Sequence, residues 1–229
     1  MISLYHISLL HRLIKEGSVK VCRNNTKNCG CDCSSDSNVK RTILGPFEGI
    51  DSADIPKNPI KQGIAIIPSS SGVFPVVLVT TTDGLANEAS LLGFGTTVTG
   101  CPITGNTIDL TNFLETEAFS VPHKGQITAI SASFTTFAGN LITGIVTARA
   151  QIYHAAANSN VFTPTNVFVD LSPSLTEITV VKGLKNLISP VLVEAGDHLL
   201  LAFSATATGN GDLSNFINGN ASAGITIVL

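Results

Sequence analysis

The stretch FSVPHKGQITAISASF, residues 119–134, decides the fold class of this sequence. Pro122 and Gly125 interrupt the chain on either side of a polar His-Lys pair, which is typical of a turn. After the turn, small, β-branched and aromatic residues alternate, as they do in a strand that packs one face on a core. The alternation sets Ile127, Ala129, Ser131 and Ser133 against Thr128, Ile130, Ala132 and Phe134. We therefore expect a turn followed by a β-strand.

Segments of the same kind continue from Ile64 to the last residue. They include two strands within residues 64–82, and further strands at 107–112, 147–153, 167–171, 176–181, 197–205 and 223–229. Gly93 and Gly95 lack the neighbours of a phosphate-binding loop, so we expect a bulge or a tight bend there. Helical periodicity is almost absent. Residues 64–229 therefore predict one all-β sandwich of roughly eight to ten strands, with the last strand central to a sheet or to a symmetric interface.

The composition favours a subunit that is buried in an assembly. The 229 residues are 44% hydrophobic and only 13% charged, and the mean hydropathy is +0.36. This supplies ample material for one core but leaves the surface short of charge. Because buried charges lose their hydration, interface cores avoid charged residues. We expect one globular head with a tail, and extensive contacts with other subunits.

Charge divides the chain into two kinds of polypeptide. Residues 1–62 hold nine Lys and Arg against six acids, a net charge of +3. Residues 63–229 hold four Lys and Arg against ten acids, a net charge of −6. An acidic head and scattered tail cations do not form the basic patch that tracks phosphates. We expect no nucleic-acid partner.

The first eighteen residues have no clear place in the fold. Their apolar run is short and is interrupted by two His and one Arg, so it predicts neither a membrane span nor a secretion signal. Residues 1–18 are either a short amphipathic helix or sequence upstream of the true start. Lys-Glu-Gly at residues 15–17 is what a bacterial ribosome-binding sequence would encode, and Val19 lies where a GTG start codon would follow.

Residues 19–41 form a Cys-rich tail without hydrophobic periodicity, which we expect to be flexible on its own. It carries four thiols within twelve residues: Cys22, Cys29, Cys31 and Cys33. Three interpretations stand: disulfides or other covalent links between subunits, which we favour, a metal clip, and free thiols. A fifth cysteine, Cys101, is isolated in the head and is expected to be a small buried residue.

Residues 42–63 form a Pro-rich segment whose three prolines exclude a helix and favour an extended backbone. It also carries six large apolar residues: Ile43, Leu44, Phe47, Ile50, Ile55 and Ile60. One interpretation is a plain linker. The other is a connector that pairs with or inserts into a neighbouring subunit, as in strand addition, because a linker has no need of six apolar anchors.

No motif predicts catalysis. The five histidines are His6, His11, His123, His154 and His198, and none lies in an H-E-x-x-H or G-x-S-x-G context. His123 and His154 are expected at the surface, and His198 beside Asp197 is expected to be an ordinary strand-end residue. We expect no enzyme, no cofactor and no metal. A carbohydrate-binding role would favour exposed aromatics, yet the chain has no Trp and two Tyr.

Several ordered segments resemble one known family. They are IIPSSSG, LLGFGTTVTG, TIDLTN, AFSVPHKGQITAISASF, FTPTNVFVDLSP and DHLLLAFSATATG. Together they resemble the C-terminal domain of the collagen-like exosporium glycoproteins of bacterial spores, most closely the BclB type, over about residues 64–229. The resemblance implies a jelly roll similar to tumour-necrosis-factor and C1q heads, assembled as a homotrimer on the spore surface. It also implies a structural or adhesive role without catalysis.

The chain departs from that family in its N-terminal part. Members carry a long Gly-X-Y stalk, which is replaced here by the Cys-rich tail and the Pro-rich segment. A head with a short connector resembles a subunit of an endospore appendage. We therefore expect trimeric heads that are linked head to tail by their connectors into an exosporium fibre, made in the mother cell, with an exosporium anchor protein as a further partner. The alternative is a trimeric adhesion head that binds a ligand.

Intact mass of the natural protein tests the hypothesis on the start site. If translation begins at Val19, read as Met, the measured mass will lack residues 1–18. Peptides from residues 1–18 in the natural protein would contradict it.

Overall fold

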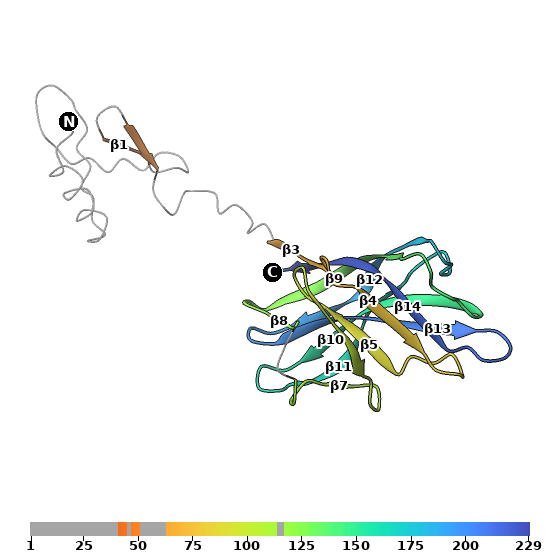
Figure 1. Cartoon of the computed structure of the whole chain (residues 1–229). Coiled ribbons are helices and arrows are strands. Elements are labelled where there is room, and N and C mark those ends of the chain that lie inside the picture. Colours follow the sequence, from red (N-terminus) through yellow and green to blue (C-terminus); the bar gives the residue numbers. More distant parts are fainter. Residues whose placement is uncertain (1–40, 45–46, 51–62, 114–116) are drawn as a thin grey trace, which may run out of the picture. The chain divides into compact units, whose positions relative to one another are not determined.

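The computed structural model describes residues 41–44, 47–50, 63–113 and 117–229 (Figure 1). It divides the chain into two compact units, Met1–Lys61 and Gln62–Leu229. The sequence had placed the start of the head at residue 64. The described residues contain strands and turns but no helix, and so no helix that could cross a membrane.

The first unit contains one described pair of strands. β1 (Arg41–Leu44) and β2 (Phe47–Ile50) pair antiparallel, with Leu44 opposite Phe47. Four of the six apolar connector residues belong to these strands, whose pairing with each other the sequence reasoning did not predict. The other two, Ile55 and Ile60, and the four tail cysteines lie outside the described residues.

The second unit, the head, is built from strands β3 to β14. Their bounds are β3 Ile64–Ser70, β4 Val76–Thr80, β5 Glu88–Leu92, β6 Thr97–Pro102, β7 Ile108–Asp109, β8 Phe119–Ser120, β9 Gly125–Thr136, β10 Ile145–Ala155, β11 Val161–Asp170, β12 Val180–Val193, β13 His198–Thr208 and β14 Asn215–Val228. The five-stranded sheet has the order β12-β9-β14-β3, with β4 also paired to β14. The seven-stranded sheet has the order β6-β5-β13-β10-β11-β7, with β8 paired to β13.

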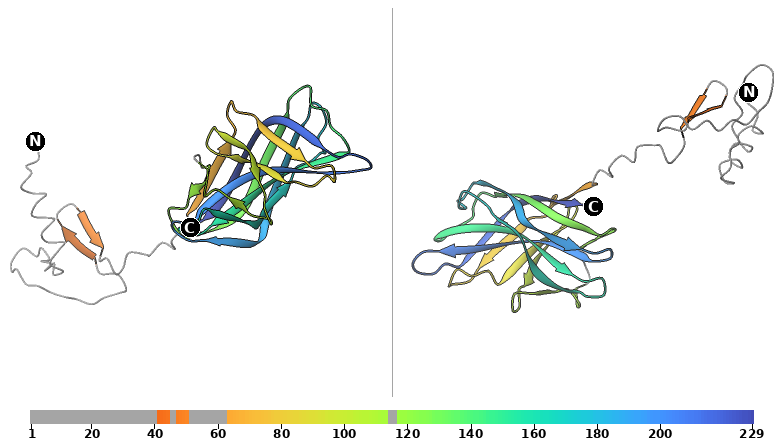
Figure 2. Two further views of the ribbon diagram at one scale, coloured as in Figure 1. Left: turned by 60° about the horizontal axis from the view of Figure 1, so that its bottom comes forward. Right: turned by 180° about the vertical axis from the view of Figure 1, so that it is seen from behind.

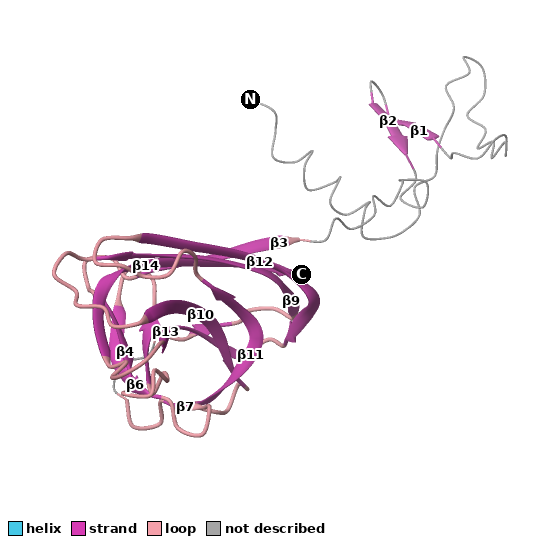
Figure 3. Cartoon of the chain, turned by 90° about the vertical axis from the view of Figure 1, so that its right-hand side faces the viewer, coloured by secondary structure: helices cyan, strands magenta, loops and turns pink. Residues whose placement is uncertain are grey.

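The connections between the two sheets make the head a jelly-roll sandwich. The chain crosses from one sheet to the other between β4 and β5, β8 and β9, β9 and β10, β11 and β12, β12 and β13, and β13 and β14. Such repeated crossings of antiparallel strands are the Greek-key pattern of jelly rolls. Figure 3 shows β3, β14 and β12 in one layer and β10, β13 and β11 in the other. The predicted all-β jelly roll is confirmed, and the last strand, β14, is central to its sheet.

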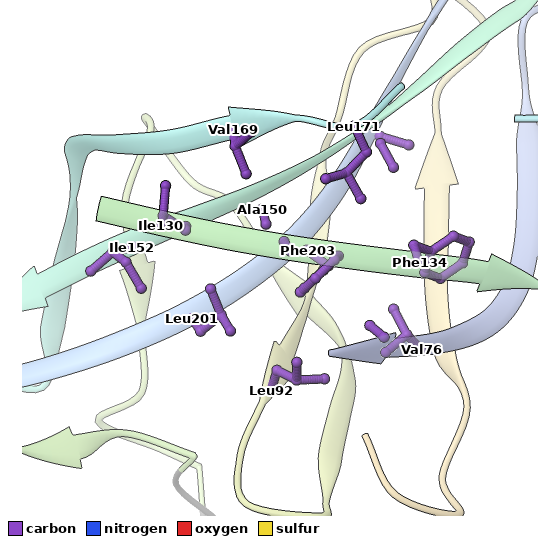
Figure 4. Close-up of a cluster of buried hydrophobic side chains, with 14 of the residues drawn as sticks. Val76, Leu92, Ile130, Phe134, Ala150, Ile152, Val169, Leu171, Leu201 and Phe203 are labelled. Atoms are coloured by element: carbon purple, nitrogen blue, oxygen red, sulfur yellow. The ribbon is translucent and has the colours of Figure 1, made fainter. Parts of the chain in front are cut away.

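The core lies between the two sheets. Inward side chains of both layers meet there, among them Ile130 and Phe134 from β9 and Phe203 from β13 (Figure 4). Phe134 and Phe203 are fully buried. A second, smaller cluster on the other side of the seven-stranded sheet encloses Tyr153 and Leu200. The apolar alternation read from the sequence therefore supplies the core side chains.

A β-bulge at Thr128 changes the alternation that the sequence predicted for β9. Thr226 and Ile227 are adjacent on β14, but they pair with Ala129 and Ile127, so Thr128 is an extra residue. Because a bulge adds one residue, it returns the next side chains to the opposite face. Ile127 and Ile130 are therefore both fully buried. The prediction that these two side chains face opposite sides was wrong.

Most expected strands coincide with observed ones, with one clear exception. The predicted strand at 176–181 was wrong, because β12 begins only at Val180. Thr176 and Thr179 instead bond Thr136: their carbonyl oxygens accept hydrogen bonds from its hydroxyl at 3.2 Å and 3.3 Å. These hydrogen bonds hold residues 176–179 in a turn, where the sequence predicted a strand.

Deleting Thr128 tests the bulge. Removal of one residue forces Ile127 toward solvent, which should lower the free energy of unfolding by about 3 kcal/mol or more, the cost of losing a large core side chain. Thr128→Ala keeps the residue count and should change stability by less than about 1 kcal/mol. Guanidinium unfolding measures both; equal stability of the two variants would contradict the bulge's role.

Candidate interaction surface

The outer face of the five-stranded sheet is defined by rows of side chains that follow the strand register. From one edge to the other, the rows are Leu192–Gln126–Val228–Ile64, Asn186–Ala129–Thr226–Ile66, Leu184–Ser131–Gly224–Pro68, Lys182–Ser133–Ser222–Ser70 and Val180–Thr135–Asn220. Directly paired residues point to the same face of a sheet. We call these five rows the outer face. One charged residue, Lys182, occurs in them.

Large apolar side chains stand at both edges of the outer face. On β3, Ile64 and Ile66 are 69% and 71% exposed, and on β12 Leu184 is 70% exposed. Between these edges, β9 and β14 present small side chains, so the middle of the face is a depression floored by Ser131, Ser222 and Gly224. A depression that is lined by one charged residue, Lys182, and flanked by apolar side chains is a surface that another protein surface can cover closely.

The strand β12 forms one edge of this sheet, where the Lys182 backbone pairs with Ser172 through two hydrogen bonds. Four residues, 187–190, lie opposite the single Thr128, so the strand bulges outward and Ile188 is fully exposed. Pro190 lies in the bulge, where its missing N–H removes no ladder bond. Lysines, a proline and a bulge are features that keep an edge strand from pairing with another sheet, so a partner would cover the exposed apolar side chains of β12 and not extend its backbone ladder.

The sequence reasoning missed this surface. It recognised only the first two residues of β12 as strand, because it ended the segment at Val181. A signal was present: Val180, Leu184 and Leu192 lie at even spacings, on the same side of the strand as the polar residues Lys182 and Asn186. It was obscured because exposed apolar residues look like core residues in a sequence.

An aromatic side chain with two cations closes one side of the sandwich. Two cations lie over the ring of Phe168 on β11. Cζ of Arg149 is 4.4 Å and Nζ of Lys185 is 3.7 Å from the centre of the ring. Arg149 also donates two hydrogen bonds to Asp170, at 2.6 Å and 3.0 Å. This bidentate bond to Asp170 is the main reason why the pKa of Arg149 is raised. Because Lys185 belongs to β12, the cluster ties the two sheets together.

His154 and Asp197 form a partly buried pair at the end of the head where the C-terminus lies. Nε2 of His154 lies 2.8 Å from a carboxylate oxygen of Asp197, which also accepts the Glu194 N–H at 2.9 Å. The backbone hydrogen bond from Glu194 is the largest cause of the lowered pKa of Asp197, followed by the bond to His154. From the sequence, Asp197 was considered only with its neighbour His198, and that pair was predicted to have no catalytic role. Its true partner comes from β10, 43 positions away.

The remaining reactive groups of the described residues do not form a catalytic set. Cys101 is buried and free, as expected, and burial together with the charge of Glu88 raises its pKa to about 11, so it stays a thiol at neutral pH. Within the described ranges no three His, Cys, Asp or Glu side chains are grouped to hold a metal. Among the described residues, no Ser, Thr or Cys side chain forms a hydrogen bond to the ring of His154.

Comparisons with known proteins give little similarity. No family model matches the chain, and no curated protein matches it. Among solved structures, it is similar to the Eiger TNF from S. frugiperda, with 13% identity and a TM-score of 0.35. That match covers 72% of this chain and 92% of the other.

The lowered pKa of Asp197 predicts an acid-sensitive contribution to stability. A carboxylate whose pKa is lower in the folded state stabilises the fold above its unfolded value of about 3.9, and this contribution is lost as the pH falls through the folded value. Asp197→Asn should therefore lower the melting temperature at pH 6, and the difference from the wild type should narrow below about pH 4. Thermal scans across this range, with Glu177→Gln as the control, measure it; a difference that does not change with pH would contradict the prediction.

Proposed function

We propose that this protein is a structural subunit of a bacterial spore-surface fibre, in which trimeric heads are joined head to tail by N-terminal connectors. The observation that carries the proposal is the outer face, which exposes apolar ridges on β3 and β12 and holds a single charge. The resemblance of residues 64–229 to the exosporium heads supports the location on the spore and the three-fold symmetry. Synthesis in the mother cell and an exosporium anchor protein belong to the same proposal.

The size of the outer face fits a partner that covers it. Rows lie about 7 Å apart along a strand and strands about 4.8 Å apart, so five rows over four strands span on the order of 500 Å². A stable interface buries about 800 Å² on each partner. The outer face supplies most of this area, and neighbouring loops supply the rest. A second copy of the head, which presents the same face and edges, is the partner we propose.

The N-terminal part of the chain would then link one trimer to the next. Its six apolar residues and the strands β1 and β2 give it the means to bind a folded surface. Each strand hydrogen bond in such a joint contributes only about 0.5–1.5 kcal/mol net. Disulfides formed by Cys22, Cys29, Cys31 and Cys33 would make the joint resistant to heat and detergent.

Truncation separates the two levels of assembly. A chain that begins at Ile64 keeps the whole head and should form soluble trimers that no longer polymerise, because the connector is absent. Light scattering after gel filtration gives the mass, and sedimentation gives the polymer fraction. Long polymers formed by this truncated chain would refute the connector model.

A charge on the outer face tests the trimer. Leu184→Glu places a carboxylate at the proposed interface, where loss of an apolar anchor costs about 2 kcal/mol or more, or roughly a thirtyfold weaker association. Val161→Glu, on β11 of the other sheet, is the matched control and should remain trimeric. The truncated head carries both substitutions for the mass measurement, and trimers that persist in Leu184→Glu at low micromolar concentration would contradict the assignment.

A further inference from the structure

The end of the head away from the chain termini carries its own exposed apolar cluster. The chain enters the head beside its C-terminus: Ile64 pairs with Val228, and Leu229 donates its N–H to the Gly63 carbonyl (Figure 2). The turn between β13 and β14 lies at the opposite end (Figure 1). We call that opposite end, made of loops 81–87, 137–144, 172–179 and 209–214, the distal end.

The large apolar side chains exposed at or beside the distal end include Leu85, Phe137, Leu141, Ile178 and Phe216. Leu141 is 88% and Ile178 is 72% exposed, although neither strand packing nor turn geometry requires a large apolar residue there. Burying such side chains against a partner would contribute on the order of 1.5–3 kcal/mol each. Burial of this cluster against a partner would therefore be energetically favourable.

Hydrogen bonds tie the segments that carry the cluster into one platform. The buried side-chain amide of Asn140 donates to the carbonyl oxygens of Phe137 and Asn218, at 2.7 Å and 2.9 Å, and its oxygen accepts the Asn218 N–H. Thr136 donates its N–H to Thr179 and accepts the Thr179 N–H on its hydroxyl. These bonds hold the loop after β9, the loop before β12 and the start of β14 together. A rigid platform binds a partner without a large ordering cost.

The loop beyond Asn140 is fixed in the same way. The side chain of Asn215 accepts the Thr143 N–H at 2.7 Å and donates to the carbonyl oxygens of Thr143 and Leu213. Leu141 therefore projects from a loop that is pinned at both ends. Its exposure is a property of a defined conformation.

The distal end is also acidic. Its four loops contain Asp83, Glu177 and Asp212 and no Lys, Arg or His. Hydrogen bonds from Ser214 lower the pKa of Asp212, which keeps that carboxylate charged. The net charge of +3 of the N-terminal part lies in residues 1–40; residues 41–60 hold two cations against three acids, a net charge of −1, together with six large apolar residues. Residues 41–60 therefore match the distal end in apolar character, and the net positive charge lies in the residues that precede them.

We propose that the distal end is the docking site for residues 41–60 of another copy of this chain. This inference rests on the proposed function and assigns the surface that its connector binds. A copy's own N-terminal segment joins the head at the end where β3 begins, so a joint at the distal end connects two heads in one direction. The same joint can then be repeated from head to head without closing on itself.

Photo-cross-linking of the full chain locates the connector. Phe47 is replaced by p-benzoylphenylalanine, and equal amounts of ¹⁴N-labelled and ¹⁵N-labelled protein are assembled together before irradiation. Mass spectrometry of the cross-linked peptides should find residues 137–144 or 172–179 joined to residue 47, in pairs of mixed isotope. Cross-links confined to one isotope, or to β3 and β12 of the outer face, would overturn the inference.

A surface variant provides a second, independent test of the docking site. Leu141→Ser with Ile178→Ser removes two exposed side chains, so folding should be unchanged while the sedimenting polymer falls at least tenfold. Val161→Ser, which is 41% exposed on the seven-stranded sheet, is the matched control and should polymerise as the wild type does. Equal polymerisation of both variants overturns the docking site and leaves the fibre proposal standing. A wild-type chain that forms no polymer overturns both.

Discussion

The five-stranded sheet bears large apolar side chains on both of its faces, and the described residues of the head cover only the inner one. On the inner face, Ile130 and Phe134 are buried against the seven-stranded sheet. On the outer face, Ile66 and Leu184 are exposed among the described residues of the head. Water contact with this much apolar surface is unfavourable, and covering this face is what would stabilise the proposed assembly. The proposed assembly is a consequence of this imbalance.

A bulge and several small residues in the sheet shape the outer face as an interaction surface. The bulge at Thr128 keeps Ile127 and Ile130 in the core, and it pushes residues 187–190 of the partner strand outward. Serines and Gly224 keep the middle of the face low. The cations on Phe168 close the sandwich between β11 and β12. One side of the head is thus closed by its own residues, while the outer face stays open to another subunit.

Much of the fold was predictable from residues 119–134 and their repeated pattern, because inward side chains such as Phe134 must alternate along a strand. Two features were not. The bulge at Thr128 depends on pairing with β14, a strand about a hundred residues away, so no local pattern reveals it. The outer face depends on exposed apolar residues such as Leu184, which a sequence cannot distinguish from core residues. The six connector residues were recognised only because they stand out in a Pro-rich segment.

Electron microscopy of the negatively stained full chain, with and without reductant, tests the central claim most directly. The account predicts thin fibres with a regular repeat of globular heads, which shorten or fall apart when the cysteines of residues 22–33 are reduced. Discrete particles in both conditions would contradict the account. They would favour a head that acts alone on the surface as an adhesion module.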